Sequence, residues 1–198
     1  PEGSILQTLA DVGEDAEQAL AALAEEVGAA TTPPRLVQLA TPGLGSGELE
    51  PKSIGQAIST LLPENAIVVD EGATAGGPTS GMCAVAQPHD WLSLTGGSIG
   101  YGLPASVGVA VACPDRKVVC VHGDGGAMYT IQALWTMARE NLDVTVVIFS
   151  NRKYQILQVE LARVGAQTMN KKTLDMLDLT NPELSFVEMG RGMGVESS

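Results

Sequence analysis

Four residues after an apolar stretch have the types needed to hold a phosphate group: Gly123, Asp124, Gly125 and Gly126. They follow residues 117–122, which read Lys-Val-Val-Cys-Val-His and are apolar in the middle, and they precede an expected helix. Glycines let backbone N–H groups turn toward a phosphate, and the amino end of a following helix adds partial positive charge. Asp124 would repel a bare diphosphate, so its presence indicates a divalent cation between the two. Mg²⁺ commonly shares phosphate oxygens with one or two protein oxygen ligands.

A second oxygen ligand is expected at the end of the neighbouring strand. Residues 144–150 read Val-Thr-Val-Val-Ile-Phe-Ser, and Asn151 follows immediately. Taken alone, residues 123–126 are also compatible with an ordinary strand-to-helix turn, because short glycine motifs have real false-positive rates. Asn151 favours the metal interpretation, because it places a hard ligand where the cation needs one.

The elements that position these residues are expected to form an α/β fold with three layers, αβα, around a mostly parallel sheet. Apolar strands are predicted at residues 66–70, 117–122 and 144–150, and helices at residues 51–62, 102–112 and 130–140. Strands that are apolar on both faces and alternate with helices are typical of parallel sheets covered on both sides. Ligands bind such folds at the carboxyl ends of the strands. The loops after Asp70, His122 and Ser150 are therefore where we expect the site.

The segment before residue 51 has a different character. Residues 15–27 show helical spacing of alanine and leucine with glutamates around the stripe, which predicts one amphipathic helix. Residues 31–50 are rich in Pro and Gly, which predicts a linker. One main domain is then expected over residues 51–198.

Charge and composition narrow the classes of partner and compartment. The formal net charge is −12, which argues against nucleic acid and anionic membranes, because a phosphate backbone requires a basic surface. No apolar run reaches the roughly 18 residues needed for a membrane span. The 3 cysteines have no C-x-x-C spacing and are typical of reduced thiols. We therefore expect a cytoplasmic protein.

Two motifs resemble those of enzymes that depend on thiamine diphosphate and Mg²⁺. The first is Gly-Asp-Gly at residues 123–125, followed across one helix and one strand by Asn151. The second is Thr-Gly-Gly-Ser-Ile-Gly-Tyr-Gly-Leu-Pro-Ala at residues 95–105, here called the ring segment, which is similar to the family segment that holds the aminopyrimidine ring. The chain resembles the C-terminal, diphosphate-binding domain of the acetolactate synthase large subunit and benzoylformate decarboxylase. One departure is Ser150, where the family usually has a first Asn.

The resemblance implies a role for each matching residue. It implies that Asp124, Asn151 and the Lys153 carbonyl bind Mg²⁺. It implies that the Gly97 carbonyl accepts from the amino group of the pyrimidine, and that Ile99 wedges between the two cofactor rings. Leu157 falls where pyruvate decarboxylases place a glutamate and where benzoylformate decarboxylase and acetolactate synthases have an apolar residue. The implied catalytic set is Gly97, Ile99 and Leu157, and the implied cofactor-binding set is Gly72, Thr74, Gly97, Ser98, Ile99, Gly123, Asp124, Gly125, Gly126, Asn151, Lys153 and Tyr154.

The same resemblance implies a larger enzyme that decarboxylates or carboligates a small 2-oxo acid. In the family the activating glutamate belongs to a pyrimidine-binding domain, usually of a partner subunit, within a homodimer or homotetramer. Residues 1–30 then correspond to the tail of a preceding central domain, residues 51–198 to a diphosphate domain truncated at its C-terminus, and the 198 residues alone are expected to be inactive. Whether FAD accompanies the other domains stays open.

Two other classes of function stay open on the sequence. Gly100, Gly102 and Ala105 fit a dinucleotide fingerprint, but residues 90–95 show no apolar strand before it, and Val119 and Cys120 occupy the expected place of an acidic ribose ligand. A thiamine-diphosphate-binding or assembly domain without catalysis would keep Asp124 and Asn151.

Three further side chains could line the site or exchange protons. Glu71 follows the first strand and is a candidate for lining the active site. His89 and His122 have the right chemistry for acid–base catalysis, but His122 ends an apolar strand and His89 lies in a polar loop, so neither position favours that role.

Overall fold

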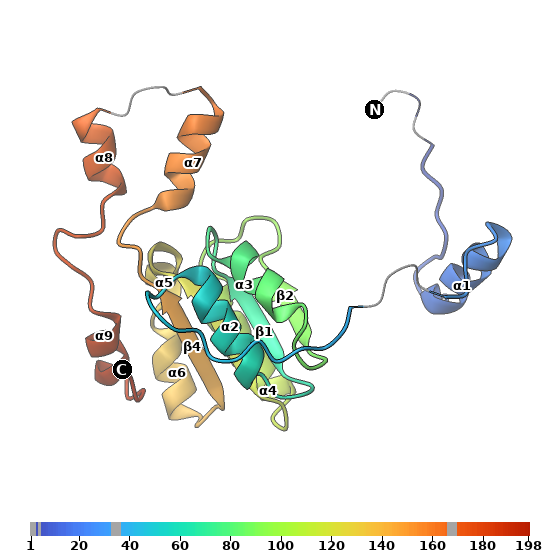
Figure 1. Ribbon diagram of the computed structural model, residues 1–198, viewed down its shortest axis with the longest axis horizontal. Coiled ribbons are helices and arrows are strands. Elements are labelled where there is room, and N and C mark those ends of the chain that lie inside the picture. The colour runs from blue at the N-terminus through green and yellow to red at the C-terminus, as the bar shows by residue number, and fades with distance from the viewer. Residues whose placement is uncertain (1–2, 4, 33–36, 166–169) are drawn as a thin grey trace. The chain divides into compact units, whose positions relative to one another are not determined.

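The chain forms two units that are described separately, and the second one contains the sheet (Figure 1). The computed structural model describes all residues except 1–2, 4, 33–36 and 166–169. The first unit, Pro1–Val37, contains helix α1 (Ala16–Glu26). The Asp15 carboxylate caps α1 by accepting hydrogen bonds from the N–H groups of Glu17 and Gln18. This is the helix predicted over residues 15–27.

The second unit, Gln38–Ser198, is built on a four-stranded sheet in which all strands are parallel. The strands are β1 (Ile67–Glu71), β2 (Asp90–Ser93), β3 (Val118–Gly123) and β4 (Val144–Phe149), in the order β2-β1-β3-β4. Val118 lies opposite both Ile67 and Val144, so the carboxyl ends of β1, β3 and β4 coincide. The register brings the loops after Glu71, Gly123 and Phe149 to one edge of the sheet.

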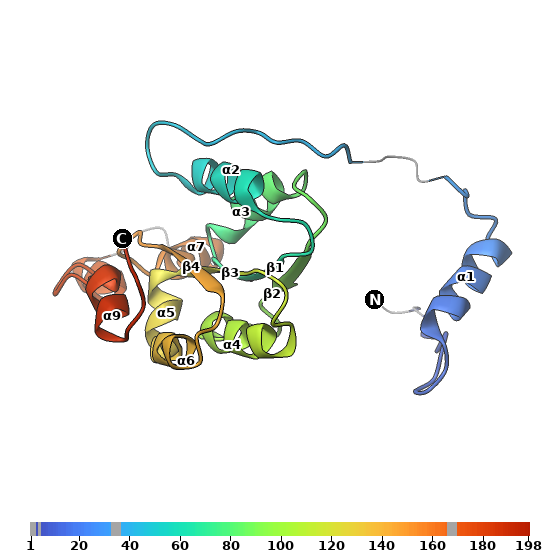
Figure 2. The same cartoon turned by 90° about the horizontal axis from the view of Figure 1, so that it is seen from below.

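Helices cover both faces of this sheet (Figure 2). Helices α2 (Pro51–Leu61) and α3 (Gly76–Cys83) lie on one face, and α4 (Gly102–Ala112), α5 (Asp124–Thr130) and α6 (Ala133–Arg139) lie on the other. The three-layer αβα architecture predicted from the sequence is confirmed. Helices α7 (Gln155–Arg163), α8 (Lys171–Leu177) and α9 (Phe186–Gly192) follow β4.

The core has two parts because side chains of a strand alternate between the faces of a sheet. Val68, Val121 and Phe149 pack toward Ile58 of α2 on one side. Leu103 of α4 and the α6 residues Leu134 and Met137 pack around Cys120 on the other side, with Phe186 of α9 against them. The apolar runs of β1 and β3 are thus buried on both faces, as their composition predicts.

The predicted ranges do not include strand β2 or the helices α3, α5, α7, α8 and α9. Strand β2 has only 4 residues and is mostly exposed, so its sequence lacks the apolar run or the alternation of apolar and polar residues that predicts a strand. Helices α3 and α5 contain Gly-Gly near their amino ends, and glycine is a poor helix former in isolation. A strand does precede Gly100, but β2 is mostly exposed and not the apolar strand that a dinucleotide fingerprint follows. The missing ribose acid is further evidence against that site.

The segment between α1 and α2 carries no helix or strand in residues 37–50. Part of it is nevertheless attached to the second unit. The Ala40 N–H donates to the Val85 carbonyl at 2.8 Å, and the Thr60 hydroxyl donates to the Gly43 carbonyl at 2.9 Å. Among the residues that the structure describes, no helix combines the length and apolar character needed to cross a membrane.

Replacing Gly55 with alanine is expected to loosen the contact between α2 and α3. A Cβ atom at Gly55 would lie 3.0 Å from the Thr79 Cα and 3.1 Å from the Met82 Cβ, and overpacking of this kind costs about 1–3 kcal/mol. Exposed Gly108 of α4 is the matched control, because a Cβ there meets nothing within 4 Å. Urea unfolding should show a lower free energy of unfolding for Gly55→Ala and a gain of roughly 0.5–1 kcal/mol for Gly108→Ala. A gain in both variants would contradict the close packing.

Candidate functional site

The carboxyl ends of β1, β3 and β4 surround a small cavity of about 70 Å³, here called the strand-end cavity. Cavities that enclose whole small molecules measure roughly 300–1,000 Å³, so this one suits one end of a ligand. Its lining includes most of the predicted cofactor-binding residues: Gly72, Thr74, Gly123, Asp124, Gly125, Gly126, Asn151, Lys153 and Tyr154.

Asp124 is held in place between two strand-end loops. Its carboxylate is 4% exposed. Oδ1 accepts from the Gly125 N–H at 2.8 Å, and Oδ2 accepts from the Arg152 N–H at 2.6 Å. The second bond reaches across from β3 to the loop after β4. A carboxylate has about four acceptor positions, so two remain for a cation.

Asn151 is placed by a local network on the other side of the same cavity. Its Oδ1 accepts from the Lys153 N–H at 3.1 Å, and its Nδ2 donates to the Gln155 Oε1 at 2.9 Å. The Lys153 carbonyl accepts from the Gln155 N–H at 2.9 Å. Both carbonyl oxygens keep a second lone pair for another partner. Gln155 also lines the cavity and was not predicted, because a single Gln at a helix start gives no signal in the sequence.

Backbone strain occurs on both sides of the strand-end cavity. Ala73 and Arg152 have φ angles of 48° and 59°, in the left-handed region that alanine and arginine seldom adopt. Residues in such conformations concentrate at functional sites, where the surrounding structure holds them. Ala73 follows Gly72, and Arg152 follows Asn151, so each strained residue adjoins a predicted ligand.

Two glycines of the cavity are required by close packing. A Cβ atom at Gly125 would lie 2.5 Å from Cε1 of the Tyr154 ring, and one at Gly72 would lie 2.8 Å from the Gly76 amide nitrogen. These distances are shorter than carbon side chains tolerate. Backbone atoms therefore approach the cavity directly, which is how glycine loops receive a phosphate.

The ring segment lies outside the strand-end cavity. Gly97, Ser98 and Ile99 are exposed, and the Ile99 side chain is 57% exposed. The Ile99 N–H donates to the Gly97 carbonyl at 2.9 Å, so the carbonyl assigned to the pyrimidine amino group is bonded within the ring segment here. Leu157 lies on α7, is 47% exposed and does not line the cavity, although its neighbour Ile156 does. Gly97, Ser98, Ile99 and Leu157 thus do not line the strand-end cavity together with residues 123–126, here called the diphosphate loop.

Glu71 and His122 form a buried pair beneath this surface. Glu71 is 5% exposed and His122 is fully buried, whereas His89 is half-buried. The Glu71 Oε2 and the His122 Nε2 lie 2.9 Å apart, close enough for an ion pair although the approach is off the line of a hydrogen bond. Glu71 therefore faces the protein interior and does not line the strand-end cavity.

The Glu71 carboxylate is stabilised in its charged form. Burial by itself raises the pKa of this carboxyl, but contacts from His122 and from the N–H groups of Gly102 and Gly100 outweigh burial and hold the pKa below its usual value. Glu71 is thus poorly suited to donate a proton. The buried thiols of Cys83 and Cys120 are also unreactive, because burial raises their pKa to about 11 and about 12.

The protein groups at the strand-end cavity suit a cation only if a phosphate supplies further oxygen ligands. In the described part of the chain, no three His, Cys, Asp or Glu side chains gather to hold a metal ion on their own. Of the residues with a described position, Asp124 is the one carboxylate that lines the cavity. Mg²⁺ characteristically binds one or two protein carboxylates together with phosphate oxygens. The donors present therefore match a magnesium diphosphate better than a free metal ion.

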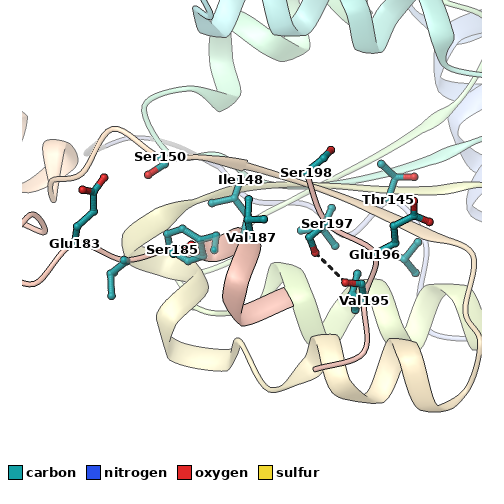
Figure 3. A pocket seen from close by; sticks show the side chains of 14 residues that line it. Thr145, Ile148, Ser150, Glu183, Ser185, Val187, Val195, Glu196, Ser197 and Ser198 are labelled. Carbon is teal, nitrogen blue, oxygen red and sulfur yellow. Dashed lines mark hydrogen bonds between the residues drawn. The ribbon is translucent and has the colours of Figure 1, made fainter. Parts of the chain in front are cut away.

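A wider cavity of about 840 Å³ lies elsewhere, between β4 and α9 (Figure 3). Ile148 of β4 and Val187 of α9 line it, and the Ser197 hydroxyl near it donates to the Val195 carbonyl at 3.0 Å. Its charged lining side chains are Glu183 and Glu196, which would repel an anionic ligand. The larger cavity is therefore not where a diphosphate would bind.

Comparison with known proteins agrees with the geometry of the strand-end cavity. Residues 76–198 match the family described as thiamine pyrophosphate enzyme, C-terminal TPP binding domain. A relative from Mycobacterium tuberculosis, provisionally named acetolactate synthase large subunit IlvX, is 51% identical over 98% of this chain and 38% of its own length. The benzoylformate decarboxylase of Pseudomonas aeruginosa is 33% identical over 90% of this chain and 33% of its own length.

A solved structure shares the fold. The thiamine diphosphate-dependent 4-hydroxybenzoylformate decarboxylase of Rhodococcus jostii RHA1 aligns with a TM-score of 0.68 and 26% identity, over 90% of this chain and 33% of that protein. The chain therefore spans about a third of the length of the proteins it resembles.

Proposed function

Because the chain belongs to the thiamine pyrophosphate enzymes and matches their C-terminal TPP binding domain, we propose that the strand-end cavity binds the diphosphate of thiamine diphosphate through Mg²⁺. In this proposal Asp124, Asn151 and the Lys153 carbonyl are the protein ligands of the cation. Gly72, Thr74 and the Gly123–Gly126 loop surround the diphosphate, with Tyr154 beside Gly125.

The observation that carries the proposal is the position of Asp124. Its carboxylate lines the same small cavity as Asn151 and Lys153 and accepts the Arg152 N–H at 2.6 Å. A buried carboxylate at a cavity lined by glycines would repel an anion. A divalent cation bound between the two groups attracts both the Asp124 carboxylate and the anion.

The chain's own residues would bind and orient the cofactor. Thiamine diphosphate supplies an electron sink for cleavage next to a carbonyl group. In this chain the strand-end cavity anchors one end of the cofactor, and Gly97, Ser98 and Ile99 of the ring segment contact its pyrimidine end. The β-branched side chain of Ile99 is stiff about χ1, so it suits a wedge that keeps the two rings bent toward each other.

For the whole protein we propose decarboxylation or carboligation of a small 2-oxo acid. Relatives named acetolactate synthase and benzoylformate decarboxylase support this class of substrate. The exposure of Ile99, Ile156 and Leu157, at 57%, 42% and 47%, supports a further domain that covers them. We propose that the covering domain is the pyrimidine-binding domain of a partner subunit, within a cytoplasmic homodimer or homotetramer.

The reaction is tested by release of CO₂ from pyruvate and from benzoylformate, measured on the intact protein with thiamine diphosphate and Mg²⁺. We expect CO₂ release that stops when EDTA removes the cation. Binding of the cofactor without turnover of any 2-oxo acid would instead favour a non-catalytic domain. If NADH quenched the fluorescence of the protein and thiamine diphosphate did not, the result would favour a dinucleotide site.

Asn151→Ala is expected to weaken binding of magnesium thiamine diphosphate by about tenfold, because loss of one neutral ligand contact costs roughly 1–1.5 kcal/mol. Calorimetry at fixed Mg²⁺ measures this loss. Asn170→Ala is the control, because the Asn170 side chain caps α8 and does not line the cavity, so its variant should bind as wild type does. An unchanged affinity in Asn151→Ala would contradict its role as a ligand.

A further inference from the structure

Glu71 is bonded to the ring segment at two points. The Gly100 N–H donates to its Oε1 and the Gly102 N–H donates to its Oε2, each at 2.6 Å. These residues lie 29 and 31 positions beyond Glu71 in the chain. Hydrogen bonds to an ionised carboxylate are shorter and about twice as strong as neutral ones. One carboxylate thus fixes the backbone at the end of the ring segment.

Gly100 is held through both of the peptide groups that meet at its Cα atom. Its N–H is bonded to Glu71, and its carbonyl accepts from the Thr130 hydroxyl at 2.8 Å. Its φ is 86°, and a Cβ atom there would lie 2.8 Å from the Tyr129 Cβ. The ring segment therefore has little freedom to shift at this residue. Gly97 and Ile99 lie one to three residues earlier.

The same Glu71 carboxylate also lies next to Gly126 of the diphosphate loop. A Cβ atom at Gly126 would lie 3.0 Å from the Glu71 Oε1 and 3.0 Å from the His122 Cε1. His122 directly precedes the Gly123–Gly126 loop, and its Nδ1 lies 3.0 Å from the Gly123 carbonyl oxygen. Gly72, which lines the strand-end cavity, is the residue after Glu71. Glu71 is therefore packed between the ring segment and the loops of the cavity.

We propose that Glu71, supported by His122, is a positioning residue that sets the ring segment at a fixed distance from the diphosphate loop. This inference rests on the proposed function, because it assigns the two connected loops to the two ends of one cofactor. Glu71 itself contacts neither end of the cofactor. It acts through Gly100 and Gly102 on one side and through Gly126 on the other.

The test compares two ligands in the intact protein: thiamine diphosphate, which needs both loops, and inorganic diphosphate, which needs only the cavity, each with Mg²⁺. Glu71→Gln should lower the affinity for thiamine diphosphate by about tenfold or more, because an amide N–H₂ then faces a backbone N–H in place of a charged acceptor. The affinity for inorganic diphosphate should change by less than about twofold, since the cavity residues are unaltered.

Thr130→Val is the second variant, because it removes only the hydroxyl that holds the Gly100 carbonyl. It should lower the affinity for thiamine diphosphate about threefold or more with no effect on inorganic diphosphate, as expected for one neutral hydrogen bond. Thr60→Val is its matched control. Thr60 also donates to a glycine carbonyl, that of Gly43, but that carbonyl lies outside the site. This variant should bind both ligands as wild type does.

The outcomes separate this inference from the proposed function. Wild-type protein that binds neither ligand would overturn the proposed function. Wild-type binding with equal losses for both ligands in the variants would show general disruption and would overturn the positioning role. Unchanged affinity for thiamine diphosphate in Thr130→Val would overturn it even if Glu71→Gln failed to fold.

Discussion

Asp124→Asn is expected to abolish measurable binding of thiamine diphosphate at Mg²⁺ concentrations that saturate wild type. The change keeps the shape of the side chain but removes the buried charge that faces the cation. Only one of the N–H groups of Gly125 and Arg152 keeps an oxygen acceptor, because an amide N–H₂ replaces the other carboxylate oxygen. Loss of one partner of a buried ionic contact costs about 3–5 kcal/mol, which corresponds to at least about a 100-fold loss of affinity.

Calorimetric titration measures this effect, and Asp143→Asn is its control. Asp143 precedes β4 at the opposite end of the strand and pairs with Lys117 at the surface, so its variant should bind as wild type does. If Asp124→Asn bound thiamine diphosphate with wild-type affinity, Asp124 would not be the metal ligand.

Ile99→Ala is expected to reduce the turnover number of the intact enzyme by about 100-fold, the loss that follows a misplacement of about 1 Å between reacting groups. The affinity for thiamine diphosphate should change little, because the wedge acts on the shape of the cofactor and not on its charges. Stability should also be unaffected, since the Ile99 side chain is 57% exposed and contributes little to the core.

The matched control is Val111→Ala, which shortens an aliphatic side chain of α4 that is 61% exposed and outside the ring segment. Turnover, the dissociation constant of the cofactor and the free energy of unfolding should all stay at wild-type values. Full activity of Ile99→Ala would show that the ring segment is wrongly aligned with the family.

The strands that carry the diphosphate loop could be predicted because they are buried on both faces. Residues 67–69 of β1 and 118–121 of β3 are apolar on both faces of the sheet, which is typical of a parallel sheet. The order of elements then placed Asp124 and Asn151 at one edge. The structure brings both side chains to the strand-end cavity.

Other features of the site depend on contacts that no local pattern encodes. The bonds from Glu71 to Gly100 and Gly102 span about 30 residues, so only the folded chain brings these groups together. The left-handed conformations of Ala73 and Arg152 are imposed by their surroundings, because neither residue type favours that region. The exposed positions of Ile99 and Leu157 likewise depend on how the loops fold back.

The most direct test of the proposed site is a crystal structure of the intact protein with thiamine diphosphate and Mn²⁺ in place of Mg²⁺. Anomalous scattering from Mn²⁺ locates the cation without reference to the protein atoms. We expect one peak at coordination distance from the Asp124 carboxylate, the Asn151 side-chain oxygen and the Lys153 carbonyl, with the diphosphate on its far side against Gly125 and Gly126. A cation or diphosphate bound elsewhere, with the strand-end cavity filled only by solvent, would contradict the account.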